Sequence, residues 1–246
     1  MSKVLTECKP EKRFSNKLRE VFSTIVILIT VVSLAGAIIL SHTYNDKSVN
    51  AASSAIYKGK DDQKKVALMF NVYENAENVM KILAILRKYS AKATFFIGGI
   101  WAEKNPETLM EIKHAEQEVA SHGYLHRDHS KMTIEQNKEE IKISCSLIEK
   151  ITGEKVRLFA PPSGAFGKNT EIACRDLGQK LILWSKDTID WRDRDVSLLV
   201  KRATSDPQNG DLILMHPKEQ SVRALPQIIE FYQGAGFELA TVGEIV

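Results

Sequence analysis

The sequence has few of the residues that cross-link small folds. It holds three cysteines in 246 residues, Cys8, Cys145 and Cys174, and their separations match no metal-binding spacing. A scaffold built on several disulfides or on a cysteine-based zinc cluster is therefore excluded. A bond between Cys145 and Cys174 could form in an oxidising exterior, but we expect two buried thiols.

The sequence also lacks an excess of charge outside its first twenty residues. Six lysines and arginines against three glutamates precede residue 21, and that difference of three equals the formal net charge of the whole chain, +3. The remainder is balanced, so a basic surface for nucleic acid has no support and no nucleic-acid partner is expected.

Long hydrophobic runs are absent except for one, Val21 to Leu40, which carries no charge. As a helix it would be about 30 Å long, the thickness of the hydrocarbon core of a bilayer. The basic residues before it favour a cytoplasmic N-terminus. Ala35 to Ala37 resemble a signal-peptide cleavage site, but Ile38 to Leu40 continue the apolar run past it.

We therefore predict a single-pass protein of the cell membrane with its C-terminal domain outside the cytoplasm. Residues 1–20 would be the cytoplasmic N-terminus, 21–40 the transmembrane anchor, 41–64 a polar linker and 65–246 the folded domain.

From residue 65 onward, short apolar runs alternate with helical patterns. The expected strands are 65–70, 93–97, 118–120, 157–160, 181–184, 211–215 and 237–240. The expected helices are 76–89, one beginning at Pro106, one from a Thr133 and Gln136 capping box to Gly153, 171–177, 196–204 and 222–233. This alternation predicts an α/β fold with a parallel sheet, and about seven strands suit an incomplete (β/α) barrel.

Unusual polar residues and prolines follow five of these strands: Asn71, His122, Pro161 with Pro162, Asp187 and His216. In a (β/α) barrel the carboxyl ends of the strands form the face that carries active sites. His122 and His126 are four residues apart and could be two ligands of a metal, but such sites usually need a third protein ligand. The remaining histidines, His42, His114 and His129, show no such placement, and we expect them in linkers or on the surface.

The chain from Lys65 to Val246 resembles the NodB-type polysaccharide deacetylases of carbohydrate esterase family 4, in the branch of spore-forming bacteria that contains PdaB and YlxY. The resemblance rests on "KKVAL", "KATFFIGG", "SHGYLH", "FAPPSGAF", "DTIDW" and "LILMH", which occur in the order of the family. It implies a distorted (β/α) barrel, an N-acetylated glycan such as peptidoglycan as partner, and hydrolysis of the amide carbon–nitrogen bond with a divalent metal.

The resemblance also implies roles for single residues. His122 and His126 would hold the metal, taken as a weakly held zinc, and His216 would protonate the departing amine. Asp187 would orient His216 and favour its charged form. The residues implied in contacting the sugar are Pro161, Pro162, Phe166 and Trp191; for Phe166 and Trp191, plain core packing is the alternative.

The first motif departs from the family. Active relatives read Thr-Phe-Asp-Asp-Gly where this chain reads "MFNVYEN", which places Asn71 at the catalytic base and Val72 at the metal aspartate. An amide takes no proton at neutral pH, and valine has no donor atom. Ala160 stands where the family has an arginine that pairs with the catalytic aspartate. The candidates for a third metal ligand are Asn71, Glu74, Glu77 and Asp128.

Three hypotheses follow. The chain is a membrane-anchored N-deacetylase of cell-wall or spore-wall glycan with a remodelled metal site; or it is a glycan-binding relative that has lost the chemistry and holds no metal; or it is a scaffold protein of the cell envelope.

Overall fold

The computed structural model describes residues 20–36, 55–60 and 62–246, and the chain divides into two units, Met1–Ala52 and Ser53–Val246. In the first unit a helix covers residues 20–36, and the last residues of the expected anchor, 37–40, lie outside the described residues. Within the described ranges, no helix is at once long enough and apolar enough to cross a membrane. Cys8 and His42 also fall outside the described residues.

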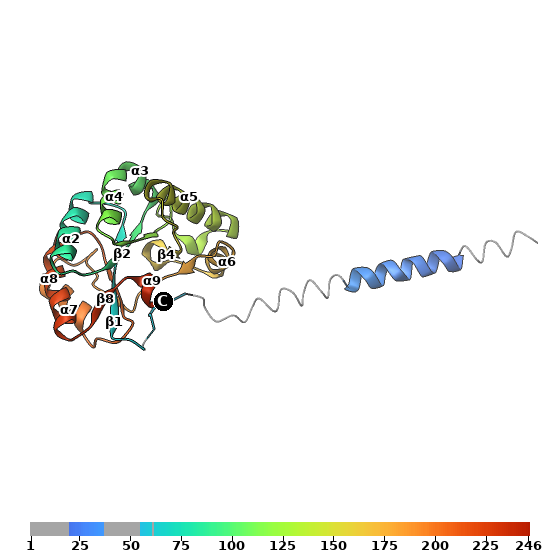
Figure 1. Cartoon of the computed structure of the whole chain (residues 1–246). Coiled ribbons are helices and arrows are strands. Elements are labelled where there is room, and N and C mark those ends of the chain that lie inside the picture. The colour runs from blue at the N-terminus through green and yellow to red at the C-terminus, as the bar shows by residue number, and fades with distance from the viewer. Residues whose placement is uncertain (1–19, 37–54, 61) are drawn as a thin grey trace, which may run out of the picture. The chain divides into compact units, whose positions relative to one another are not determined.

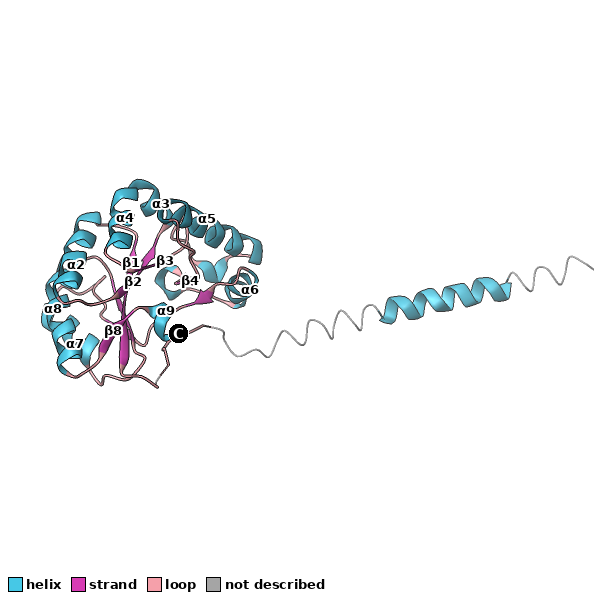
Figure 2. Cartoon of the chain, viewed as in Figure 1, coloured by secondary structure: helices cyan, strands magenta, loops and turns pink. Residues whose placement is uncertain are grey.

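The second unit contains a curled half-barrel of parallel strands (Figures 1 and 2). Its strands are β1 (Lys65–Val72), β2 (Ala93–Ile97), β3 (Glu118–Ser121), β4 (Leu158–Phe159), β5 (Lys180–Leu181), β6 (Lys186–Asp187), β7 (Leu212–Met215) and β8 (Glu238–Ala240). Seven of them follow the order β5-β4-β3-β2-β1-β7-β6, and β8 pairs with the first residues of β1. The predicted parallel (β/α) architecture is thus confirmed. The two-residue β6 was not expected, because a run so short has no periodicity.

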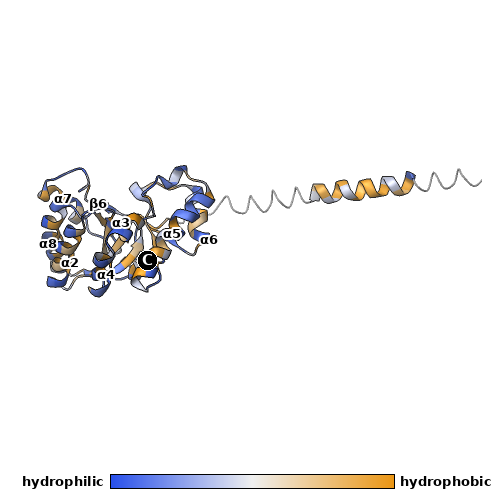
Figure 3. Ribbon diagram, turned by 90° about the horizontal axis from the view of Figure 1, so that it is seen from above, coloured by the Kyte–Doolittle hydropathy of each residue, from blue (hydrophilic) through white to orange (hydrophobic). Residues whose placement is uncertain are grey.

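Helices surround these strands in Figure 1: α2 (Ala76–Lys88), α3 (Gly99–Lys104), α4 (Pro106–His114), α5 (Ile134–Thr152), α6 (Lys168–Asp176), α7 (Val196–Thr204), α8 (Glu219–Gly234) and α9 (Val242–Ile245). The predicted capping box opens α5: the Thr133 hydroxyl accepts from the Gln136 backbone, and the Gln136 side chain accepts from the Thr133 backbone. The short helices α3 and α9 were not predicted. The more hydrophilic residues of the domain lie on its outer helices and loops (Figure 3).

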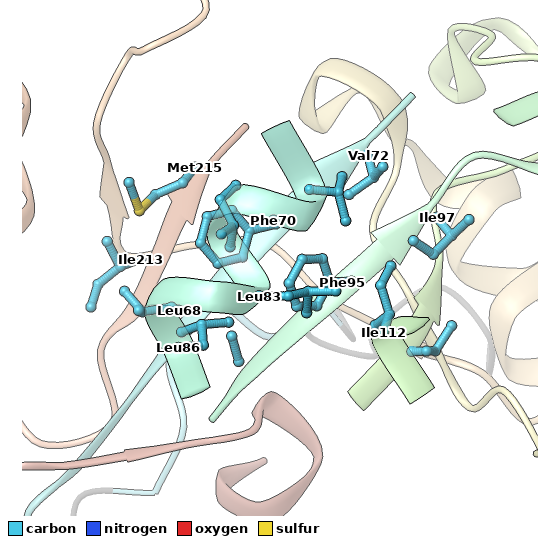
Figure 4. Packing of buried hydrophobic residues seen from close by; sticks show 14 of the residues in the cluster. Leu68, Phe70, Val72, Leu83, Leu86, Phe95, Ile97, Ile112, Ile213 and Met215 are labelled. Carbon is cyan, nitrogen blue, oxygen red and sulfur yellow. The ribbon is translucent and has the colours of Figure 1, made fainter. Parts of the chain in front are cut away.

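Strand β1 sends its side chains alternately to two apolar clusters. Leu68, Phe70 and Val72 belong to the larger cluster, which packs between the strands and the helices (Figure 4), and the Phe70 and Phe95 rings stack with centroids 5.1 Å apart. Met69 belongs to the smaller cluster on the opposite face. Because successive side chains of a strand alternate between faces, Asn71 follows Met69 on that inner face. Val72 therefore points away from Asn71 and into the helix layer.

Residues 55–60 belong to the folded domain and not to the linker predicted over 41–64. Ile56 lies between two residues of the β5 region, donating to the Leu181 carbonyl and accepting from the Leu183 backbone at 2.8 and 2.7 Å. Gly59 donates to the Gly210 carbonyl at 2.7 Å, and a Cβ on Gly210 would lie 2.5 Å from the Gly59 oxygen. Only glycine permits such a close approach of the two backbones.

Candidate functional site

A cavity of about 400 Å³ opens where the strands of the half-barrel end. It is lined by Asn71, Tyr73, His122, His126, Ser163, Trp184, Asp187, Trp191, Leu214 and His216. The structure therefore brings together six residues that the sequence singled out: Asn71, His122, His126, Asp187, Trp191 and His216. They meet because parallel strands end at the same edge of a sheet and their loops converge there.

His122 follows β3 and is almost fully buried. Its Nδ1 lies 2.8 Å from the Ala160 carbonyl oxygen, which can only accept, so Nδ1 carries the proton. Burial, and after it the nearby His126, hold the pKa of His122 well below its ordinary value, so the ring is neutral. Nε2 is thus the unprotonated nitrogen, the tautomer found in metal-binding histidines.

The loop that carries His126 is fixed by the carboxylate of Glu140, on helix α5. Glu140 Oε2 accepts from the backbone nitrogens of Tyr124 and Leu125 at 3.0 and 2.8 Å. His126 itself adopts a left-handed backbone conformation with φ 55°. Burial lowers the pKa of His126 as well, so both histidines are held in the neutral form.

Tyr73 fills the space among the three histidines of the cavity. Its ring centroid lies 4.4 Å from that of His126, 6.3 Å from His122 and 6.1 Å from His216. Burial raises the pKa of its phenol, so it is protonated at neutral pH. Sequence reasoning did not single out Tyr73, although it stands at the glycine of the family's first motif. A glycine there would leave this space open.

Three of the four candidates for a third metal ligand do not line the cavity. Glu74 pairs with Lys218, Glu77 pairs with Lys81, and Asp128 pairs with Lys131 while it accepts from the Ser130 backbone. In residues 20–36, 55–60 and 62–246, no group of three or more His, Cys, Asp or Glu side chains is placed to hold a metal.

Asn71 alone of these candidates lines the cavity. Its Oδ1 is buried and has no hydrogen-bond partner among the described residues. A neutral amide oxygen with two histidines is a weaker donor set than a carboxylate with two histidines, and the Tyr73 ring covers one of those histidines. These residues do not fit a tightly held catalytic metal.

His216 is oriented by Asp190 and not by Asp187, which corrects the role that the sequence assigned. His216 Nδ1 lies 2.7 Å from Asp190 Oδ1, and the His216 backbone nitrogen donates to Asp190 Oδ2 at 2.6 Å. The Ser221 hydroxyl also donates to Oδ2, at 2.5 Å, and Asp190 is fully buried. Both aspartates belong to "DTIDW", and only the geometry of the turn decides between them.

Asp187 lines the cavity instead. It accepts from the Ile189 backbone at 2.7 Å, while burial raises the pKa of its carboxyl group. Ile189 lies in the left-handed region with φ 56°, a strained conformation for a β-branched residue. Such strain is often retained at functional sites.

Two tryptophans supply the apolar walls of the cavity. Trp191 is 55% exposed, so it is not packed in the core, which was the alternative to a sugar contact. Trp184 was not singled out from the sequence, although it ends an expected strand. Phe166 packs against the main apolar cluster outside the cavity lining. Pro161 and Pro162 are buried, and it is the next residue, Ser163, that lines the cavity.

The other histidines and cysteines that the structure describes lie outside the cavity lining. His129, expected in a linker or on the surface, is fully buried: its Nδ1 lies 2.7 Å from Asn137 Oδ1, and its ring packs on Phe159. Its place in the loop four residues before Thr133, the N-cap of α5, hid this from sequence reasoning. His114 is exposed. Cys145 and Cys174 are free, as predicted, and burial raises the pKa of their thiols to about 11 and about 12.

Comparison with known proteins gives a consistent set of relatives. The family model described as polysaccharide deacetylase matches residues 58–182. The uncharacterized protein YlxY of Bacillus subtilis is 36% identical over 78% of this chain and 60% of its own length. The peptidoglycan-N-acetylmuramic acid deacetylase PdaC of Bacillus subtilis is 30% identical over 84% of this chain and 47% of its own. This chain therefore spans roughly half to three fifths of these two relatives.

Among solved structures, the wild-type BA3943 protein of Bacillus anthracis is described as a pseudoenzyme of carbohydrate esterase family 4. It has a TM-score of 0.76 and 32% identity, covering 80% of this chain and 70% of its own. A mutant of BA3943 with the same TM-score, 0.76, is described as having restored enzymatic activity.

Proposed function

We propose, since the chain belongs to the polysaccharide deacetylase family, that its domain binds N-acetylated cell-wall glycan in the cavity and that the wild-type site hydrolyses it very slowly or not at all. The observation that carries this proposal is the Tyr73 ring among His122, His126 and His216, beside Asn71 in place of a base. Deacetylases of this family generally depend on a metal. The donor set described above is poorly suited to one.

The glycan part of the proposal rests on the walls of the cavity. Trp184 and Trp191 offer apolar faces, and the space of about 400 Å³ is within the range of small-molecule sites. Flat aromatic surface beside a few polar groups suits the apolar face of a sugar ring. Relatives named as peptidoglycan deacetylases support peptidoglycan as the glycan.

Replacing Trp191 by alanine should weaken glycan binding about tenfold or more, because an exposed aromatic anchor contributes at least about 1.4 kcal/mol. Isothermal titration of the purified domain with N-acetylglucosamine oligomers or soluble peptidoglycan fragments measures it. Phe231→Ala is the matched control, an exposed ring (39%) on α8 outside the cavity lining, and should leave affinity unchanged. Equal affinities for wild type and Trp191→Ala would contradict the assignment of the cavity.

Deacetylation is a second candidate function, favoured by the His216 and Asp190 pair. A histidine whose Nδ1 donates to a buried carboxylate is the arrangement of a general acid, and His216 lines the cavity. If this function holds, Asn71 must take the place of the base or the reaction must proceed without one, at a rate lower by about 10² to 10⁴.

We also propose that the domain works outside the cytoplasm, where cell-wall glycan lies. The lysines and arginines before residue 21, followed by an uncharged stretch, support this orientation. Protease added to intact protoplasts should digest the C-terminal domain while a cytoplasmic marker stays whole. Protection of the domain until the cells are lysed would refute this location.

A further inference from the structure

A second cleft, of about 470 Å³, adjoins the cavity, and Trp191 lines both. Its other lining residues are Arg192, Arg194, Lys218, Glu219, Gln220 and Arg223. Four of these carry a positive charge and one a negative charge. The balance of charge elsewhere in the domain makes this local excess unusual.

Two of the four cations are neutralised by neighbours and two are not. Arg192 forms a two-point ion pair with Asp193, with both nitrogen–oxygen distances 2.9 Å, and Lys218 pairs with Glu74. Among residues 20–36, 55–60 and 62–246, no carboxylate forms an ion pair with Arg194 or Arg223. Both side chains are exposed to solvent, so they are available to a ligand.

Gln220 links the cleft to the residues of the cavity. Its Nε2 donates to the Asp190 carbonyl at 2.6 Å, and the carboxylate of the same aspartate holds His216. A ligand that extends from the cavity past Trp191 therefore enters the cationic cleft without leaving the surface of the domain.

We propose that Arg194 and Arg223 bind an anionic group, carboxylate or phosphate, carried by the glycan whose N-acetylated sugar occupies the cavity. Guanidinium groups recognise both anions through paired hydrogen bonds. This inference rests on the proposed glycan binding and narrows it to glycans with acidic substituents. Neutral chitooligosaccharides lack such a group.

Affinity measurements with four probes test this. They are the neutral N-acetylglucosamine tetramer, the same tetramer with one 6-phosphate, a tetrasaccharide that alternates N-acetylglucosamine with N-acetylmuramic acid, and the methyl ester of the last. We expect at least one anionic probe to bind wild type about tenfold more tightly than its neutral counterpart. Arg194→Ala with Arg223→Ala should remove that preference and leave affinity for the neutral probes unchanged. The preferred anion identifies carboxylate or phosphate as the group bound.

Arg175→Ala serves as the control, an exposed arginine on α6 outside the cleft, and should keep the preference. The inference would be overturned if wild type bound charged and neutral probes equally, or if Arg175→Ala lost the preference for anionic probes as fully as the double variant does. Either result would leave the proposed glycan binding intact. Failure of all four probes to bind would remove the proposed function itself.

Discussion

The triple variant Asn71→Asp, Val72→Asp, Tyr73→Gly should bind zinc tightly and release acetate from peptidoglycan at least about 10² times faster than wild type. The gain in rate corresponds to the return of a general base, which is worth about 10² to 10⁴. The gain in affinity corresponds to a carboxylate ligand beside His122 and His126. Metal analysis after dialysis and an acetate assay measure the two gains separately.

Tyr73→Gly is essential to this expectation. The Val72 side chain packs in the apolar cluster between β1 and the helices, so an aspartate there must turn toward the histidines. Glycine at 73 gives the strand end that freedom and clears the ring from His126. Val72→Asp alone should bury an unpaired carboxylate, lower the melting temperature and bind little metal. Tight metal binding by wild type would show that the site uses a donor set of its own.

Adding Ala160→Arg to the triple variant should raise stability and activity further, and more than it does in wild type. The arginine would pair with the new carboxylate at 71, whereas beside Asn71 it would be a cation without a partner.

Asp190→Asn should lower the free energy of unfolding by about 2 to 4 kcal/mol. Both oxygens of this fully buried carboxylate accept hydrogen bonds, from the backbone and Nδ1 of His216 and from Ser221. An amide of the same shape has only one oxygen, so its NH₂ group either faces the two donors now at Oδ2 or forces His216 into the tautomer that carries its proton on Nε2. Urea unfolding at pH 7 measures the loss.

Asp187→Asn is the matched control for Asp190→Asn. Burial raises the pKa of Asp187 in the folded protein above its value in the unfolded chain. The charged carboxylate is therefore less favourable in the folded state, and the free energy of unfolding falls as the pH rises through the unfolded pKa. Removing that charge should be neutral or slightly stabilising at pH 7. If Asp187→Asn were the more destabilising of the two, the assignment of Asp190 to His216 would fail.

Much of the site could be predicted because strand ends are visible in sequence. Apolar runs fix where β1, β3 and β7 end, and topology then places Asn71, His122 and His216 at one edge. What the sequence left open depends on local backbone geometry. The left-handed turn at Ile189 decides that Asp190, three residues after Asp187, reaches His216.

The burial of His129 and the packing of Tyr73 were missed for a related reason. His129 is buried by contacts with Asn137 and Phe159, which come from different parts of the chain. Tyr73 reads as an ordinary loop residue until the three histidine rings around it are placed. Contacts between segments distant in sequence carry no signal in the pattern of either segment alone.

The most direct test is to measure acetate release from peptidoglycan by the wild-type domain with zinc in excess, under conditions in which the domain is shown to bind the glycan. Binding without acetate above the level of a protein-free control is the predicted result, with release appearing in the triple variant. Acetate release by wild type at the rate of the triple variant would contradict the claim that Tyr73 and Asn71 have removed the chemistry from this site.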